Sequence, residues 1–271
     1  MKTIAMAVVY DGTAYHGWQR QKNAVTVQQT IEEALCALTR ETVQIVGCSR
    51  TDAGVHALDY VFHFQSHTEI PVEKLPYALN YHLGTDICAL AAWEMPEDFH
   101  ARFSARGKEY HYRIWNRPMP NPFLTRYSWH VPYHLDVAAM KKAAPAMEGT
   151  HDFAGFMASG GDQKTTIRTV RTCRVCEDSQ TPGLITVKIA ADAFLYNMVR
   201  IMTGTLAEIG LGKIPAEELP AIIASRDRRR GGKAETDQHS GCAEGTDIVL
   251  KAFGTLDFFE FCAKEPSDKA E

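Results

Sequence analysis

Segments patterned like β-strands alternate with amphipathic helical segments in both halves of this chain, and this order restricts the folds open to it. In the first half, Ile4, Met6 and Val8 alternate with smaller or polar residues, as in a half-buried strand. A helix is predicted from Thr26, which forms a capping box with Gln29. The first half is predicted to contain, in order, a strand over 4–9, a helix over 26–38, strands over 43–47 and 57–64, and a helix over 72–82.

The second half repeats this order of elements without repeating residues. Its predicted elements are a strand over 108–115, a helix over 136–147, hairpin strands over 169–176 and 184–190, helices over 193–209 and 216–225, and a strand over 248–253. Strands mixed with helices in both halves predict an α+β fold with two similar lobes. The predicted lobes cover 1–105 and 106–253, and a disordered tail is expected over 254–271.

Composition points to a globular protein of the cytoplasm. The contents of 45% hydrophobic and 23% charged residues are ordinary for such proteins. No apolar run approaches the roughly 20 residues that a membrane helix needs. The apolar stretch over 4–9 is too short for the core of a signal peptide and has no cleavage site, so it is predicted to be a first strand. We therefore expect a cytoplasmic protein that does not interact with a membrane.

Seven scattered cysteines do not suggest a disulfide framework, because the number is odd and no secretion signal precedes them. Cys173 and Cys176 form a single C-x-x-C, which is either half of a zinc site, a redox pair or part of an ordinary strand. No second pair and no Cys/His cluster follows at ligand spacing, which favours the strand. The sequence therefore predicts no metal.

Net charge does not identify a nucleic-acid-binding protein, since it is −4 with a pI near 6.3. Local clusters of basic residues are more suggestive, although such clusters are more often solvated faces than phosphate sites. The clusters are Arg102, Arg106 and Lys108; Arg168, Arg171 and Arg174; and Arg226, Arg228, Arg229 and Arg230.

The segment 47–56 gathers Ser, Arg, Thr, Asp and His side chains in a predicted loop between two strands. Loops on a rigid scaffold often carry chemistry. A carboxylate such as that of Asp52 can act as a covalent nucleophile when it is kept ionised, and Arg50 could lower its pKa. The alternative is structural, because Asp followed by a small residue and Gly also makes an Asx-turn.

Two further candidates are open to two interpretations each. Tyr110 and Tyr112 share one face of a predicted strand, where they either pack in the core or offer a platform for an unpaired base. Arg200 lies on the predicted helix over 193–209 and either enters a site or faces solvent. The periodicity of the apolar residues on this helix favours solvent.

The order of several motifs resembles the TruA family of tRNA pseudouridine synthases. The resemblance rests on Tyr-Asp-Gly-Thr-Ala-Tyr-His-Gly-Trp-Gln-Arg-Gln at 10–21, Thr-Val-Gln at 26–28, the Arg-Thr-Asp loop within 47–57, Phe-His-Ala-Arg-Phe-Ser-Ala at 99–105, Lys-Glu-Tyr-His-Tyr at 108–112, His-Asp-Phe at 151–153, and 194–204 with Met-Val-Arg inside it. These motifs cover residues 1 to about 230.

The resemblance implies isomerisation of uridine to pseudouridine in the anticodon arm of tRNA, at positions 38, 39 and/or 40. It implies two ferredoxin/RRM-like lobes with antiparallel sheets, which form a pseudouridine synthase fold with the active-site cleft between them. Asp52 would be the nucleophile, Tyr110 and Arg200 would share the catalytic site, and Arg50 and Arg102 would bind substrate with Tyr110. The enzyme would act as a homodimer and need no cofactor.

The end of the chain departs from this pattern. The family closes with a small-residue and Pro-rich segment, a Gly-Leu pair and a strand, of which Ala243-Glu244-Gly245 is what remains here. One alternative is therefore a tRNA-binding protein with impaired catalysis. Another is an Asp-dependent N-glycoside hydrolase, which would break the same bond and release free uracil.

Overall fold

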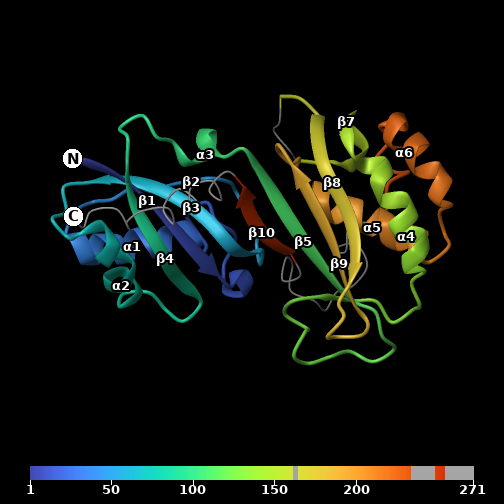
Figure 1. Cartoon of the computed structure of the whole chain (residues 1–271), viewed down its shortest axis with the longest axis horizontal. Helices are drawn as coiled ribbons and strands as arrows, with labels where there is room; N and C mark the ends of the chain where they lie inside the picture. The colour runs from blue at the N-terminus through green and yellow to red at the C-terminus, as the bar shows by residue number, and fades with distance from the viewer. Residues whose placement is uncertain (161–163, 233–247, 254–271) are drawn as a thin grey trace, which may run out of the picture. The chain divides into compact units, whose positions relative to one another are not determined.

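The chain divides into two compact units, each made of antiparallel strands and helices (Figure 1). The computed structural model describes residues 1–160, 164–232 and 248–253. Of these, the first unit contains 1–53, 57–108 and 250–253, and the second contains 54–56 together with the described residues of 109–249. This composition confirms the α+β class. The departure from the family pattern falls in 233–253, of which 233–247 lies outside the described residues, as does the tail 254–271.

The first unit is built on the strand order β4–β1–β3, with antiparallel pairing throughout. Its strands are β1 (Lys2–Tyr10), β2 (Val46–Gly47), β3 (His56–Ser66) and β4 (Ile87–Met95), and β10 (Ile248–Phe253) lies next to β3. In the register of β1 with β3, Met6 faces Phe62 and Val8 faces Tyr60. These side chains lie on one face of the sheet, where they are buried.

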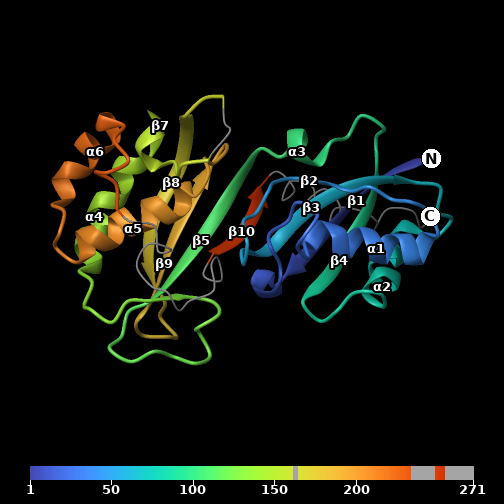
Figure 2. The ribbon, with the colours of Figure 1, turned by 180° about the vertical axis from the view of Figure 1, so that it is seen from behind.

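The helices of the first unit are α1 (Val27–Thr39), α2 (Leu75–Asn80) and α3 (Ala101–Ser104), and α1 lies across one face of the sheet (Figure 2). The predicted start of α1 is confirmed, because Thr26 Oγ1 accepts a hydrogen bond from the backbone N–H of Gln29 at 3.4 Å. The side chain of Gln29 bonds to Glu33 instead of closing the capping box.

The second unit is built on the strand order β5–β9–β8–β7. Its strands are β5 (Gly107–Trp115), β6 (Trp129–His130), β7 (Gly149–Asp152), β8 (Ile167–Glu177) and β9 (Leu184–Ala191), and β6 pairs with β5 in parallel. The predicted hairpin is confirmed, since β8 and β9 pair antiparallel. Helices α4 (Val137–Ala143), α5 (Met198–Gly210) and α6 (Leu219–Ser225) lie on one side of this sheet (Figures 1 and 2).

Helix α5 is buried on all sides, and only Glu208 among its residues is partly exposed. A helix without a polar face must lie inside a domain. The predicted start of this helix at residue 193 is wrong. Asn197 stands before the helix with a φ of 56°, in the left-handed region, so the helical backbone begins at Met198.

Three other predicted helices are each divided between an α-helix and a tighter turn. Residues 72–82 form η2 (Val72–Lys74) and α2, residues 136–147 form α4 and η3 (Ala144–Met147), and residues 216–225 form η5 (Ala216–Glu218) and α6. A proline lies in the first two positions of α2, η3 and α6, where its missing N–H costs least. Over the described part of the chain, no helix combines the length and apolar character that crossing a membrane requires.

Candidate active site

The candidate nucleophile Asp52 is an exposed side chain on the loop 48–53 of the first unit, which we call the Asp loop. The residue before it is fixed in place. Thr51 is buried, its carbonyl accepts a hydrogen bond from the Trp18 N–H at 3.1 Å, and its hydroxyl bonds to the Tyr10 hydroxyl at 3.0 Å. The start of the loop is fixed by Tyr60, whose hydroxyl donates to the carbonyl of Ser49. An exposed carboxylate thus follows a stretch of backbone that is held at Ser49 and at Thr51.

Trp18 and its neighbours belong to residues 11–20, a segment that we call the strap. Two strap carbonyls accept hydrogen bonds from the first N–H groups of α1. Gly17 accepts from Val27 at 3.2 Å, and Trp18 accepts from Gln28 at 3.1 Å. These N–H groups have no partner within the helix, so the strap both caps α1 and is anchored by it.

A buried carboxylate holds the strap, α1 and the chain before β2 together. Glu32 is 5% exposed and accepts hydrogen bonds from Arg20 at 2.7 Å, from the Ile45 N–H at 3.2 Å and from the Gln28 side chain at 3.0 Å. A buried charge requires such partners. This network makes the scaffold under the Asp loop rigid.

The two arginines predicted to bind substrate lie at different places in the first unit. Arg50 is exposed on the Asp loop itself, two residues from Asp52. Arg102 is exposed on α3, where the neighbouring Ala101 N–H donates to His63 Nδ1 at 3.1 Å. Because side chains alternate along β3, His63 points away from the face that holds Tyr60. Arg50 thus lies on the Asp loop itself, whereas Arg102 lies on α3, which contacts β2 just before that loop.

Tyr110 and Arg200 belong to the second unit. Tyr110 is half-buried on β5, and its ring meets the edge of Phe194 with centroids 4.9 Å apart. Arg200 on α5 is only 4% exposed. The expectation that Arg200 faces solvent is wrong, because α5 has no solvent-facing side. Tyr112, which shares the strand face with Tyr110, is a core residue at 1% exposure.

The cluster of arginines after α6 is occupied by local partners. Arg226 pairs with Asp152 at 3.2 Å, Arg229 with Asp227 at 2.9 Å, and Arg228 donates to the carbonyl of Gly232 at 3.1 Å. The hydrogen bond from Arg229 lowers the pKa of Asp227 to about 2. These contacts favour a structural role for this cluster over phosphate binding.

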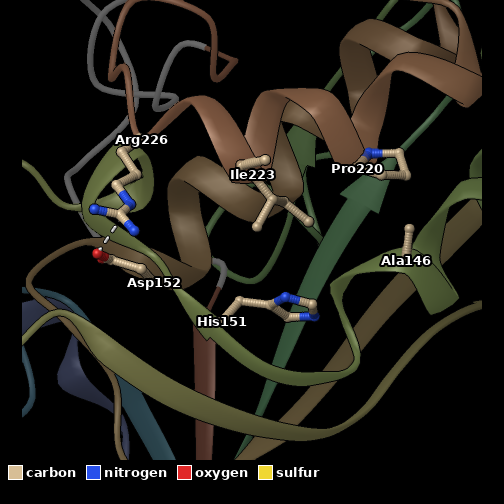
Figure 3. Close-up of a pocket in the computed structure, with 7 residues that line it drawn as sticks. Ala146, His151, Asp152, Pro220, Ile223 and Arg226 are labelled. Atoms are coloured by element: carbon tan, nitrogen blue, oxygen red, sulfur yellow. Dashed lines mark ion pairs between the residues drawn. The ribbon is translucent and has the colours of Figure 1, made fainter.

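A pocket of about 260 Å³ opens in the second unit beside one of these pairs (Figure 3). It is lined by Ala146, His151, Asp152, Pro220, Ile223, Ala224 and Arg226. The carboxylate of Asp152 is already bonded to Arg226, to the Thr166 hydroxyl at 2.5 Å and to the Ala154 N–H at 3.1 Å. The pocket therefore presents a satisfied ion pair and an apolar wall, and we assign it no catalytic role.

The C-x-x-C lies in a strand, as predicted. Cys173 and Cys176 are both on β8. Cys173 is 1% exposed, and burial raises the pKa of its thiol to about 12. A protonated, buried thiol is inert as a nucleophile or ligand. Across the described residues, no three His, Cys, Asp or Glu side chains are grouped in a way that could hold a metal ion.

Sequence reasoning did not identify the residues that hold the Asp loop. Gly17 and Trp18 belong to a motif in the sequence, and the motif alone indicates no role for them. Tyr60 is one aromatic residue in a predicted strand and carries no local signal. Gly17 and Trp18 are far from Thr51 in the sequence, and no sequence pattern links Tyr60 to Ser49. Their contacts with the Asp loop are therefore seen only in the folded structure.

Comparison with known proteins defines the class to which this chain belongs. The sequence profile of tRNA pseudouridine synthase matches residues 6–104 and 143–240, which is most of the chain. The chain belongs to the tRNA pseudouridine synthase family, whose members are isomerases.

Several relatives within the family are similar to most of this chain. A protein of Thermoanaerobacter sp. (strain X514) named tRNA pseudouridine synthase A is 48% identical over 86% of this chain and 94% of its own length. The protein of that name from Acetivibrio thermocellus is 47% identical over 86% and 94%. The tRNA pseudouridine synthase A 2 of Clostridium tetani is 43% identical over 92% and 97%. These relatives confirm the resemblance to the TruA family.

A solved Cbf5–Nop10–Gar1 complex also matches, with a TM-score of 0.33 and 12% identity over 76% of this chain and 44% of that chain. This likeness is too low to support an argument.

Proposed function

We propose that the protein converts uridine to pseudouridine in the anticodon arm of tRNA, at positions 38, 39 and/or 40, with Asp52 as the nucleophile. The observation that carries the proposal is the Asp loop, where an exposed carboxylate stands on a backbone fixed by Tyr10, Trp18 and Tyr60. Relatives that are up to 48% identical are named tRNA pseudouridine synthase A, which supports tRNA as the substrate.

The reaction moves one bond of the nucleotide and has no net redox change. The target base is first flipped out of its stack into the site. Asp52 then attacks either C1′ of the ribose or the uracil ring. The N1–C1′ bond breaks, the uracil turns, and C5 forms the new bond to C1′. The bond that Asp52 formed to C1′ or to the ring breaks as well, which releases the Asp52 carboxylate. C5 then loses its proton while N1 gains one, so atoms and electrons balance without a cofactor.

Tyr110 and Arg200 complete the proposed site. Tyr110 would stack on the uracil and take the C5 proton. Its half-buried position and its edge contact with Phe194 support a fixed ring orientation. Arg200 would pair with Asp52 and keep that carboxylate ionised. The burial of Arg200 supports this role, because a buried guanidinium needs an anionic or hydrogen-bonding partner.

The remaining contacts are proposed for the tRNA backbone. Arg50, exposed beside Asp52, would help to open the RNA, and Arg102 would contact a phosphate outside the immediate site. Binding by such contacts weakens as salt rises. We also propose that the protein acts in the cytoplasm and as a homodimer, which would gather modest basic patches from two copies along one tRNA.

The test is tritium release from tRNA labelled at uridine C5, comparing the wild type with Asp52→Ala. We expect release and recovery of pseudouridine at positions 38–40 with the wild type, and loss of at least about a thousandfold in rate with the variant. The unfolding temperature should not change by more than about 2 °C, because Asp52 is exposed.

Three results would contradict the proposal. Free uracil would identify an N-glycoside hydrolase. Binding of tRNA without release by the wild type would identify a binding protein. Full activity of Asp52→Ala would remove Asp52 from the chemistry.

A further inference from the structure

Thr51 is the point at which three parts of the first unit meet beside the proposed nucleophile. Its carbonyl accepts from the Trp18 N–H, and its hydroxyl bonds to the Tyr10 hydroxyl across 41 positions of the chain. Its carbonyl also lies against the α-carbon of Gly17, where an added methyl group would stand 2.4 Å away. Thr51 directly precedes Asp52, so these contacts fix the peptide plane from which the Asp52 side chain departs.

Gly17 meets two separate requirements at this place. Its φ of +84° lies in the left-handed region, which disfavours residues with a Cβ. The same Cβ would also lie 3.1 Å from the carbonyl carbon of Asp52. Gly212 has a comparable φ of +70°, but no atom lies within 4 Å of its added Cβ. Close approach to the Asp loop, and not backbone conformation alone, therefore distinguishes Gly17.

The position of the strap is fixed by several contacts. Gly17 and Trp18 are bonded through their carbonyls to the start of α1. The Trp18 ring is 2% exposed and stacks on Tyr60 with centroids 4.1 Å apart. Tyr60 in turn holds Ser49 at the start of the Asp loop. A methyl group added at Gly17 would therefore displace the Asp loop rather than the strap.

We propose that Tyr10, Gly17 and Trp18 form a clamp on Thr51 that sets the direction of the Asp52 carboxylate. They are positioning residues, and the proposal rests on the role of Asp52 given above. Asp52 itself is exposed, and the contacts of Thr51 act on the backbone from which its side chain departs. Covalent attack requires placement to within about 0.5 Å, and a displacement of 1 Å costs about a hundredfold in rate. The clamp supplies this placement through the backbone.

The first experiment compares Gly17→Ala with Gly212→Ala in the full-length protein. Both variants place alanine at a positive φ, and only the first pushes on Thr51. We expect kcat for pseudouridine formation to fall about a hundredfold in Gly17→Ala. KM for tRNA should change much less than kcat, because of the two arginines proposed to contact the RNA only Arg50 lies on the Asp loop, and Arg102 lies on α3. Gly212→Ala should keep the kcat of the wild type. Equal kcat in both variants, or a rise in KM with kcat unchanged, would overturn the clamp.

A second set of variants covers the case in which Gly17→Ala fails to fold. Thr51→Val and Tyr10→Phe each remove one side of the hydroxyl pair. We expect each to lower kcat about tenfold, the double variant to be no slower than either one, and Thr51→Ser to recover most of the rate. Additive losses, or no loss at all, would sink the proposal.

Asp52→Ala separates failure of the clamp from failure of the proposed function. If Asp52→Ala is inactive while the clamp variants behave as the wild type, only the clamp is wrong. If Asp52→Ala is fully active, the proposed nucleophile is wrong, and the clamp falls with it.

Discussion

The two units hold their candidate catalytic residues in different ways. In the first unit, Asp52 is exposed on a loop without regular secondary structure, and its neighbours are held by individual hydrogen bonds from Tyr10, Trp18 and Tyr60. In the second unit, Arg200 is buried in α5, where all residues but Glu208 are buried. The backbone beside Asp52 is held by directed polar contacts, and the helix that carries Arg200 is held by packing on all sides.

This difference predicts different responses to substitution. Loss of one hydrogen bond near an exposed loop leaves most of the core intact, so catalysis should suffer more than folding. Packing around a buried helix involves many contacts at once, and interiors tolerate little change of volume. Substitutions that change the packing of α5 should therefore lower the stability of the protein and leave the kcat of the folded molecules largely unchanged.

The largest expected effect on stability comes from Gly232→Ala. Gly232 is buried against α5, and its N–H donates to Thr205 Oγ1 at 2.7 Å. An added Cβ would lie 2.4 Å from the Thr205 nitrogen and 2.5 Å from the Gly204 carbonyl carbon. Backbone cannot move aside as a flexible side chain does, so we expect a loss of about 3 kcal/mol in the free energy of unfolding. Calorimetry should show a fall of about 6 °C or more in the unfolding temperature.

Gly231→Ala is the matched control for this change. Its nearest neighbour would be the Gly155 carbonyl oxygen at 3.2 Å, so a shift of a few tenths of an ångström would relieve the contact. We expect less than half of the loss seen for Gly232→Ala. If Gly232→Ala instead kept its unfolding temperature and lost kcat as Gly17→Ala does, the contrast between the two units would be wrong.

Smaller changes in the free energy of unfolding are expected for two substitutions within α5, and the two changes have opposite signs. Thr205 Oγ1 donates to the Ile201 carbonyl at 2.8 Å and accepts from Gly232. Thr203 is equally buried, and its hydroxyl has no hydrogen-bond partner among the residues described. Valine matches threonine in shape. Thr205→Val should lower stability by about 1–3 kcal/mol because it leaves the Gly232 N–H unsatisfied. Thr203→Val should raise stability by up to about 1 kcal/mol.

Chemical denaturation of the two valine variants measures both changes. Equal changes in the free energy of unfolding for the two variants would mean that the hydroxyl groups do not contribute to stability and that α5 is stabilised by packing alone. Such a result would sharpen the contrast with the first unit beyond what the hydrogen bonds of Thr205 suggest.

Local patterns in the sequence predicted the elements whose causes are local. The start of α1 follows from the cap at Thr26, and the hairpin of β8 and β9 follows from two alternating runs around a Thr-Pro-Gly turn. Strand β4 was not predicted, because Ile87–Met95 is rich in alanine and has little β-propensity of its own. Its conformation comes from pairing with β1, and such tertiary pairing overrides propensity.

The candidate site shows the same limit. Periodicity assigned Arg200 to solvent, because it assumes that a helix has a polar face, and α5 has none. The start of α5 was placed too early, since the left-handed backbone at Asn197 leaves no mark in the apolar pattern. The catalytic roles expected for Asp52, Tyr110 and Arg200 rest mainly on the resemblance to a family. The contact of Gly17 with Thr51 joins distant parts of the chain and had no local signal.

The smallest expected effect is a dependence of stability on pH that comes from Asp152 on β7 in the second unit. The Thr166 hydroxyl, the Ala154 N–H and the positive charge of Arg226 lower the pKa of the Asp152 carboxyl, although its partial burial opposes them. A carboxyl whose pKa is lowered by folding contributes stability above its ordinary pKa of about 4 and loses it as the pH falls through the folded-state value. The wild type should therefore lose this contribution below about pH 4.

Thr166→Val removes the largest cause of that shift. We expect it to be less stable than the wild type at pH 7 by about 1 kcal/mol or less, and the difference should shrink as the pH falls below about 4. Unfolding by urea at several pH values measures this convergence. Thr150→Val, which breaks a hydroxyl pair with Thr169 between β7 and β8, should show a difference that does not depend on pH. A loss at Thr166 as large as that at Gly232 would mean that polar contacts hold the second unit as they hold the Asp loop, and the contrast between packing and directed bonds would not stand.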